Sequence, residues 1–321
     1  MTDRELIDLT RPFAHESRFR SWLHVGSTFG LLAALAFVAL LAPWWPVRLL
    51  ASVVEGLSIV RAFILFHDFS HSALLRGSKP ATVLFHLFGI AVMTPPRVWR
   101  ETHNYHHAHT AKIVGSNVGS YAMVTTEIWK KMSPRDRVVY RMIRHPLTIL
   151  FAYFTIFVIG MGLSPFFRAP RKHVVAGLAV LLHVAAWVAA LWLGVFPAFF
   201  FGYALPVNVA CTLGAYLFYA QHNFPAMHVQ PREAWSYARA ALESSSYMEM
   251  GAVMRFFTGN IGYHHVHHLN PLIPFYRLPE AMAAVPALQT PGRTSLLPRD
   301  IVACFRLKLW DPAAGRMVGY P

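Results

Sequence analysis

Long apolar runs alternate along this chain with polar stretches that are dense in Arg, Lys and His. Two apolar runs, 24–42 and 47–66, are separated only by Pro43-Trp44-Trp45-Pro46. Each run is close to the roughly 20 residues that a helix needs to cross a hydrocarbon core about 30 Å thick. Trp side chains favour the membrane–water interface. The pattern therefore predicts a helical hairpin with a very short outer loop.

Further apolar runs follow at 81–96, 147–163, 174–194 and 196–220. The first is short and ends in Pro95-Pro96, which is typical of a re-entrant or interfacial segment. The link between the last two runs is charge-free and long enough only for a tight outer turn. The first hairpin returns the chain to the inner side, and the run 174–194 must start on the inner side to reach that outer turn. We therefore expect the 147–163 run to dip into the inner leaflet without crossing the membrane. Full crossing is the alternative, and it would move the last polar region to the opposite face.

These runs predict an all-α integral membrane protein with about four transmembrane helices, re-entrant or interfacial helices, and a cytoplasmic histidine-rich cap. The two expected outer loops contain no Lys or Arg, as the positive-inside rule requires. We expect one domain over residues 1–321, because no linker or repeat divides the chain. Residues 1–22 form an expected N-terminal cytoplasmic segment, and residues 279–321 form a cytoplasmic tail.

Composition agrees with a lipid solvent: 55% of the 321 residues are apolar and 14% are charged. Soluble proteins carry about 25% charged residues. The net charge of +14 is explained by basic inner loops, and no nucleic-acid motif accompanies it. Cys211 and Cys304 are too few for a disulfide framework.

Histidines are concentrated in three clusters. Positions i, i+3 and i+4 share one face of a helix, so each cluster presents imidazoles together. Neutral imidazole is a common ligand of iron, zinc and copper. Eight imidazoles exceed the four ligands of one tetrahedral zinc and suit two metals with open positions. The eight are His67, His71, His103, His106, His107, His264, His267 and His268.

A ninth candidate ligand, His222, stands where the last apolar run ends. Asp68 and Glu101 are candidates for orienting imidazoles by accepting their free N–H, and ordinary helix-end solvation is the competing explanation. Asn260, one turn before His264, is a candidate for holding a metal-bound water or for simply capping a helix. An isolated histidine in an apolar run, such as His183, is expected to be a packed and hydrogen-bonded residue.

The motifs HDFSH (67–71), HNYHH (103–107) and HHVHH (264–268) resemble those of the membrane fatty acid desaturase family, which carries HxxxH, HxxHH and a late HxxHH. The flanking residues 257–263 and 269–278 are similar to the acyl-lipid branch that includes omega-6 (Δ12-type) enzymes. The resemblance covers roughly residues 63–278.

This resemblance implies two irons held by the eight histidines, with His222 as a further ligand, and O2 as the oxidant. It also implies an acyl chain of a membrane lipid as substrate and electrons from a separate ferredoxin or cytochrome b5. A hydroxylase, acetylenase or ketolase on the same scaffold is the alternative among enzymes, and a membrane metal transporter is the alternative outside them. The substrate's chain length, its carrier, the double-bond position and the oligomeric state stay open.

Overall fold

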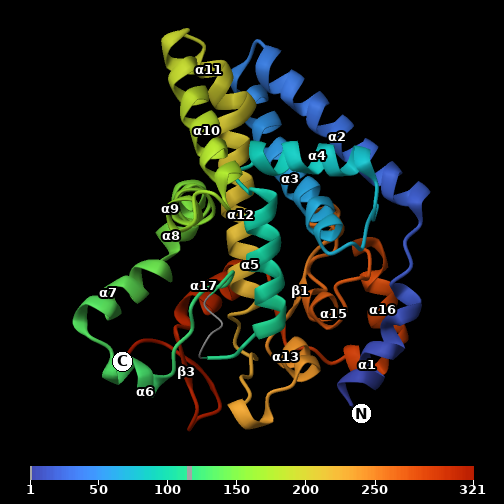
Figure 1. The fold of residues 1–321 in the computed structure, drawn as a ribbon, viewed down its shortest axis with the longest axis vertical. Coiled ribbons are helices and arrows are strands. Elements are labelled where there is room, and N and C mark those ends of the chain that lie inside the picture. The colour runs from blue at the N-terminus through green and yellow to red at the C-terminus, as the bar shows by residue number, and fades with distance from the viewer. Residues whose placement is uncertain (1, 114–117) are drawn as a thin grey trace. The chain divides into compact units, whose positions relative to one another are not determined.

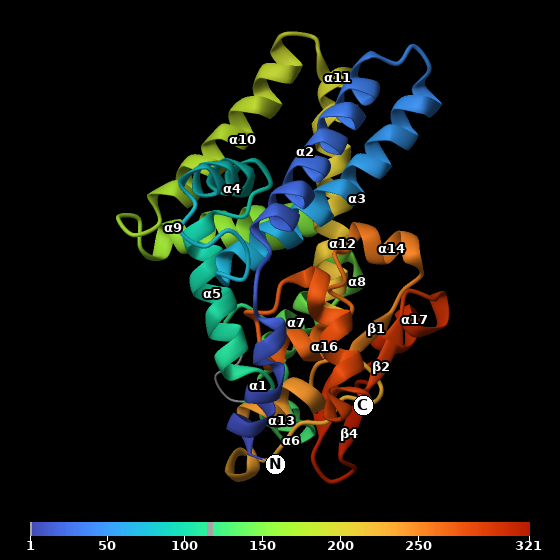
Figure 2. The same ribbon diagram turned by 90° about the vertical axis from the view of Figure 1, so that its right-hand side faces the viewer.

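The computed structural model describes residues 2–113 and 118–321, and it divides into two compact units. The helix unit comprises Ser17–Arg100 and Ile149–Ala215. The histidine unit comprises Met1–Glu16, Glu101–Thr148 and Tyr216–Pro321. Figures 1 and 2 show the elements of each unit.

Among the residues that the structure describes, four helices are long and apolar enough to cross a membrane, which confirms the predicted fold class. They are α2 (Arg18–Leu41), α3 (Trp45–Ser70), α10 (Val174–Trp192) and the continuous stretch Phe196–Gln221. The last is built from α11 (Phe196–Phe199), the π-helix η3 (Phe200–Ala204) and α12 (Leu205–Gln221).

Helices α2 and α3 pack side by side as the expected hairpin. Helix α2 begins at Arg18, several residues before the expected run, because the Ser17 side chain caps it by accepting from the Arg20 amide. Pro46 stands in the first turn of α3, where its missing N–H costs nothing.

The 81–96 run forms α4 (Lys79–Ala91), after which the chain bends sharply and α5 (Pro96–His109) begins. Gly89 permits the bend, because a Cβ at this position would lie 2.6 Å from the Thr94 carbonyl oxygen. Helix α4 has 13 residues, too few to span a membrane alone.

The 147–163 run forms α8 (Pro146–Leu150), the π-helix η2 (Tyr153–Leu163) and then α9 (Ser164–Arg168). This segment is a shorter apolar helix and is not one of the four candidate spans. Its Tyr153 hydroxyl lies 2.9 Å from Nδ1 of His183, whose Nε2 lies 2.9 Å from the Ile90 carbonyl oxygen. His183 is thus the buried, hydrogen-bonded residue that was predicted.

The histidine unit contains short helices, and it also contains strands that were not predicted. Strand β1 (Tyr247–Glu249) pairs in parallel with β2 (Arg293–Ser295), and β3 (Leu309–Asp311) pairs antiparallel with β4 (Arg316–Val318). Three residues are too few to show a period-two pattern. The helices are α1 (Asp3–Thr10), η1 (Arg11–Phe13), α6 (Thr126–Lys131), α7 (Pro134–Ile143), η4 (Arg232–Ala234), α13 (Tyr237–Glu243), α14 (Ala252–Phe257), α15 (His264–Leu269), η5 (Phe275–Arg277), α16 (Leu278–Ala284), η6 (Pro286–Leu288) and α17 (Pro298–Arg306).

Candidate metal centre

Helix α15 carries the last histidine cluster, and all six of its residues are buried. It packs against α13. The backbone just before α15 lies very close to β1. A Cβ on Gly262 would lie 2.4 Å from the Met248 carbonyl oxygen of β1, so only glycine fits at this position. The Met248 amide donates back to the Gly262 carbonyl at 2.8 Å. A short strand therefore fixes the start of the histidine-bearing helix.

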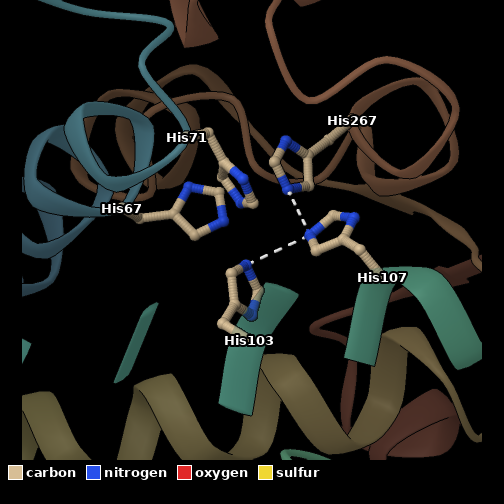
Figure 3. A group of neighbouring side chains, drawn as sticks. All are labelled: His67, His71, His103, His107 and His267. Carbon is tan, nitrogen blue, oxygen red and sulfur yellow. Dashed lines mark hydrogen bonds between the residues drawn. The ribbon is translucent and has the colours of Figure 1, made fainter. Parts of the chain in front are cut away.

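One group of histidines in this unit joins α5 to α15. Nε2 of His107 lies 3.1 Å from Nε2 of His103 and 3.1 Å from Nε2 of His267. All three residues are buried, and their rings turn toward one another, with both contacts drawn as dashed lines in Figure 3. We call His103, His107 and His267 the first group.

The second group contains His106, His222, His264 and His268. Nε2 of His222 lies 3.0 Å from Nε2 of His106 and 2.9 Å from Nε2 of His264. Nε2 of His268 lies 3.1 Å from that of His264. Ligand atoms of His106, His222 and His268 all lie within 4.8 Å of one another, close enough for one metal ion. The two groups are neighbours, since the rings of His107 and His268 stack at 4.2 Å.

Hydrogen bonds on the far side of two of these rings determine their tautomers. Nδ1 of His222 lies 3.0 Å from the Ser244 carbonyl oxygen, which can only accept, so Nδ1 carries the proton. Thr110 donates its hydroxyl proton to the His106 carbonyl at 2.8 Å, so its oxygen accepts from Nδ1 of His268 at 3.3 Å. Both rings therefore direct an unprotonated Nε2 lone pair into the second group, as metal ligation requires.

Burial also keeps these imidazoles neutral. Desolvation lowers the pKa of His222 to about 4. Desolvation, followed by the neighbouring imidazoles, lowers the pKa of His268 well below its ordinary value. Nε2 of His222 and of His268 each lies within 2.9 to 3.1 Å of Nε2 of His264, so neutral, buried imidazole nitrogens converge here as a donor set that fits a bound metal.

The helix unit places a histidine pair at the end of α3. His67 is buried, and its ring meets that of His71 edge-to-face at 4.8 Å between centroids (Figure 3). Nδ1 of His67 lies 3.0 Å from Oδ1 of Asp68 and donates to it, which leaves Nε2 for ligation. Burial, followed by the nearby His67, lowers the pKa of His71 well below its ordinary value.

The remaining candidates lie in different settings. Glu101 is half-buried in α5. Asn260 has a left-handed backbone, with φ of 55°, and its side-chain amide donates to the Phe275 carbonyl at 3.2 Å. That contact ties the turn between α14 and α15 to η5.

Several supporting residues were missed from the sequence. Thr110 lies one turn after His106, a spacing that could have revealed it. Ser244 contributes only a carbonyl, and the Tyr237 hydroxyl donates to the His268 carbonyl at 2.5 Å. Neither leaves a pattern in the sequence, because both act from another part of the chain.

A cavity of about 30 Å³ adjoins the second group. His106 and His222 line it together with Arg144, Tyr121 and Thr110. This volume accommodates about one water molecule. The cavity therefore offers polar space for a single small molecule beside two candidate ligands.

Four candidate spans among the described residues and a buried histidine cluster capable of binding metal define the class of this chain as a helical membrane protein with a candidate metal site. Residues 43–296 match the family model described as fatty acid desaturase. The chain therefore belongs to the fatty acid desaturase family, whose members are oxidoreductases.

Curated relatives agree with this membership. The chain is 27% identical over 320 residues to the "Fatty acid desaturase" of Bacillus subtilis (strain 168), covering 99% of this chain and 90% of the relative. It is 25% identical to the "sn-1 oleoyl-lipid 12-desaturase" of Synechocystis sp., with coverage of 81% and 74%. It is 28% identical to the "sn-2 acyl-lipid omega-3 desaturase (ferredoxin), chloroplastic" of Arabidopsis thaliana, with coverage of 87% and 64%.

Proposed function

We propose that this protein is an O2-dependent desaturase that introduces a double bond into an acyl chain of a membrane lipid. The observation that carries the proposal is the pair of neighbouring histidine groups in one unit, with buried rings whose Nε2 atoms converge. Two groups suit two metals, and two metals match the resemblance drawn from the histidine motifs.

We further propose that His67 and His71 complete the ligand set of the first group. Their spacing places both on one helix face, and Asp68 already holds His67 in the ligating tautomer. The nine proposed ligands are then His67, His71, His103, His106, His107, His222, His264, His267 and His268.

The donor set supports two irons over one tetrahedral zinc. Nine imidazoles exceed the four ligands of a single zinc. Imidazole is also a ligand of iron, and these residues would hold two irons that supply the chemistry of O2.

The overall reaction removes one hydrogen from each of two neighbouring methylenes, and O2 is reduced to two waters with two electrons and two protons from outside. Iron would supply the oxidising power that no side chain has. The protein's own residues keep the ligand rings neutral, fix their tautomers through Ser244 and Thr110, and bury them away from bulk water. Because neutral imidazoles add no negative charge, these ligands would leave the positive charge of the bound irons uncompensated.

The names of the relatives support finer proposals. An oleoyl-lipid 12-desaturase and an acyl-lipid omega-3 desaturase both act on lipid-bound chains by name, so we propose an acyl-lipid substrate and an omega-6/Δ12-like position. We propose a separate ferredoxin or cytochrome b5 as electron donor, since one relative's name includes ferredoxin. We place the termini and the histidine groups on the cytoplasmic side, following the basic residues.

The test is expression in a host that lacks polyunsaturated lipids, followed by fatty acid profiling by mass spectrometry. We expect a product two mass units lighter than its precursor. His106→Ala should abolish this product, whereas His86→Ala, which changes an exposed histidine of α4, should keep it. A gain of sixteen mass units would instead identify a hydroxylase. Metal flux without oxidation would identify a transporter, and either result would overturn the proposal.

A further inference from the structure

The histidine unit contains a second, larger cavity, a surface pocket open to solvent, which the proposed metal ligands do not line. Its volume is about 510 Å³, within the range of about 300–1,000 Å³ typical of small-molecule sites. Residues of β1, β2, α14 and α16 form much of its wall, and Tyr263 adds to it. The charged and phenolic side chains that line it are Tyr247, Glu249, Arg255, Tyr263 and Arg293. Tyr263 directly precedes the histidines of α15, so this cavity adjoins the last histidine cluster.

The charged side chains that line this cavity have a net charge of +1. Nη1 of Arg293 lies 2.6 Å from Oε1 of Glu249, and the two neutralise each other. Arg255 forms no ion pair with any residue that the structure describes, so two arginines and one glutamate give a net charge of +1. Tyr247 adds a neutral hydroxyl, because burial and the neighbouring Tyr263 raise its pKa to about 12.

The helix that carries Arg255 also exposes apolar side chains. Val253 is 68% exposed and Phe256 is 47% exposed, on either side of Arg255 in α14. Large apolar residues beside a basic one are typical of helices that lie in a membrane–water interface. A ligand of this cavity is therefore expected to lie at the level of lipid head groups.

We propose that this cavity binds the phosphodiester of a glycerophospholipid, with Arg255 pairing with the phosphate and Tyr247 donating a hydrogen bond to it. The inference rests on the proposed function, since it names the head-group class of the acyl-lipid substrate. A phosphodiester carries one negative charge and matches the charge of the cavity. Coenzyme A carries several phosphate charges, and most of them would be unmatched here. A guanidinium fits two phosphate oxygens at once.

The experiment measures binding to the purified full-length protein in detergent, independent of turnover. The probe is short-chain dihexanoyl phosphatidylglycerol, compared with dihexanoylglycerol, coenzyme A and inorganic phosphate. We expect the phospholipid to bind at least about tenfold more tightly than each of the other three, because a charge-assisted bidentate contact is lost or mismatched in them.

Two variants with opposite expected effects on phospholipid binding distinguish a specific contact from misfolding, because a misfolded protein would only bind more weakly. Arg255→Gln should weaken phospholipid binding about tenfold and leave dihexanoylglycerol unaffected. Glu249→Gln should strengthen it, because Arg293 is then no longer neutralised. Arg299→Gln, which changes an arginine whose side chain is 80% exposed at the start of α17, should have no effect.

Equal binding of phospholipid and dihexanoylglycerol, or unchanged binding in Arg255→Gln, would overturn the inference. So would coenzyme A or inorganic phosphate binding as tightly as the phospholipid. Failure of the proposed function would give a different result: phospholipid would still bind in a way that depends on Arg255, but fatty acid profiling would detect no new double bond. Desaturation that is indifferent to Arg255 would leave the proposed function standing and reject the head-group site.

Discussion

The guanidinium of Arg144 donates to the side-chain oxygen of Asn223 at 2.5 Å, and Asn223 directly follows the candidate ligand His222. Arg144 is 1% exposed and lies over the rings of Tyr140 and Tyr219, at 5.7 and 5.2 Å. It forms no ion pair with a carboxylate in the described part of the chain. A buried cation held by aromatic rings and an amide thus fixes the residue next to a ligand.

Arg144→Met should destabilise the protein by about 2–3 kcal/mol, because Asn223 loses a charged donor in a buried site. The measurements are thermal unfolding and metal content per chain, and both should fall. Arg141→Met, one turn earlier on α7, is the matched control. Arg141 is exposed and lies over the Trp129 ring at 5.4 Å, so its loss should cost about 0.5–1 kcal/mol. Equal losses in the two variants would contradict this role for Arg144.

Thr110→Val should weaken metal binding by about 10- to 100-fold, because His268 loses the acceptor that sets its tautomer. Thr110→Ser keeps the hydroxyl and should bind normally. Titration of the metal-free protein with Co2+, followed by its absorption spectrum, measures this affinity directly. Normal affinity in the valine variant would show that the Thr110 hydroxyl does not orient the ring.

The metal-free protein should lose stability as the pH falls below about 6.5. Burial lowers the pKa values of His222 and His265 to about 4, whereas unfolded histidines titrate near 6.5, so the unfolded state binds more protons between these values. Their contribution is complete above pH 6.5 and disappears toward pH 4. Melting temperatures between pH 7.5 and 5 measure the slope.

His265→Gln provides the control for this slope. Nε2 of His265 donates to the Leu288 carbonyl at 3.0 Å, and the glutamine amide can replace this donor without titrating. The variant should show a shallower decline than the wild type. A decline of equal slope would exclude His265 as one of the groups responsible.

Gly262→Ala should destabilise the protein by about 1–3 kcal/mol, since the added methyl group collides with the Met248 carbonyl and backbone must move. Metal content should fall with stability, because α15 begins two residues later. Gly251→Ala is the control, as nothing lies within 4 Å of a Cβ at that position. Calorimetry and metal analysis of both variants check the prediction.

The sequence predicted the four spans because about 20 apolar residues in a row have few alternatives in a membrane protein. It also predicted that the histidines of α5 and α15 would share helix faces, since i, i+3 and i+4 spacing is a local property. It could not predict how the six rings divide into two groups, nor the roles of Ser244 and Arg144. Those depend on contacts between segments far apart in the chain, and the local spacing of residues along a helix or strand carries no information about such contacts.

Strand β1 hydrogen-bonds to the turn that precedes α15, yet its partner strand β2 follows α15 in the chain. During synthesis on the ribosome, the last histidine cluster emerges before the strand that braces it. Loading of the metal centre is therefore expected to wait until β2 has emerged, so metal supply and translation become coupled steps of biogenesis.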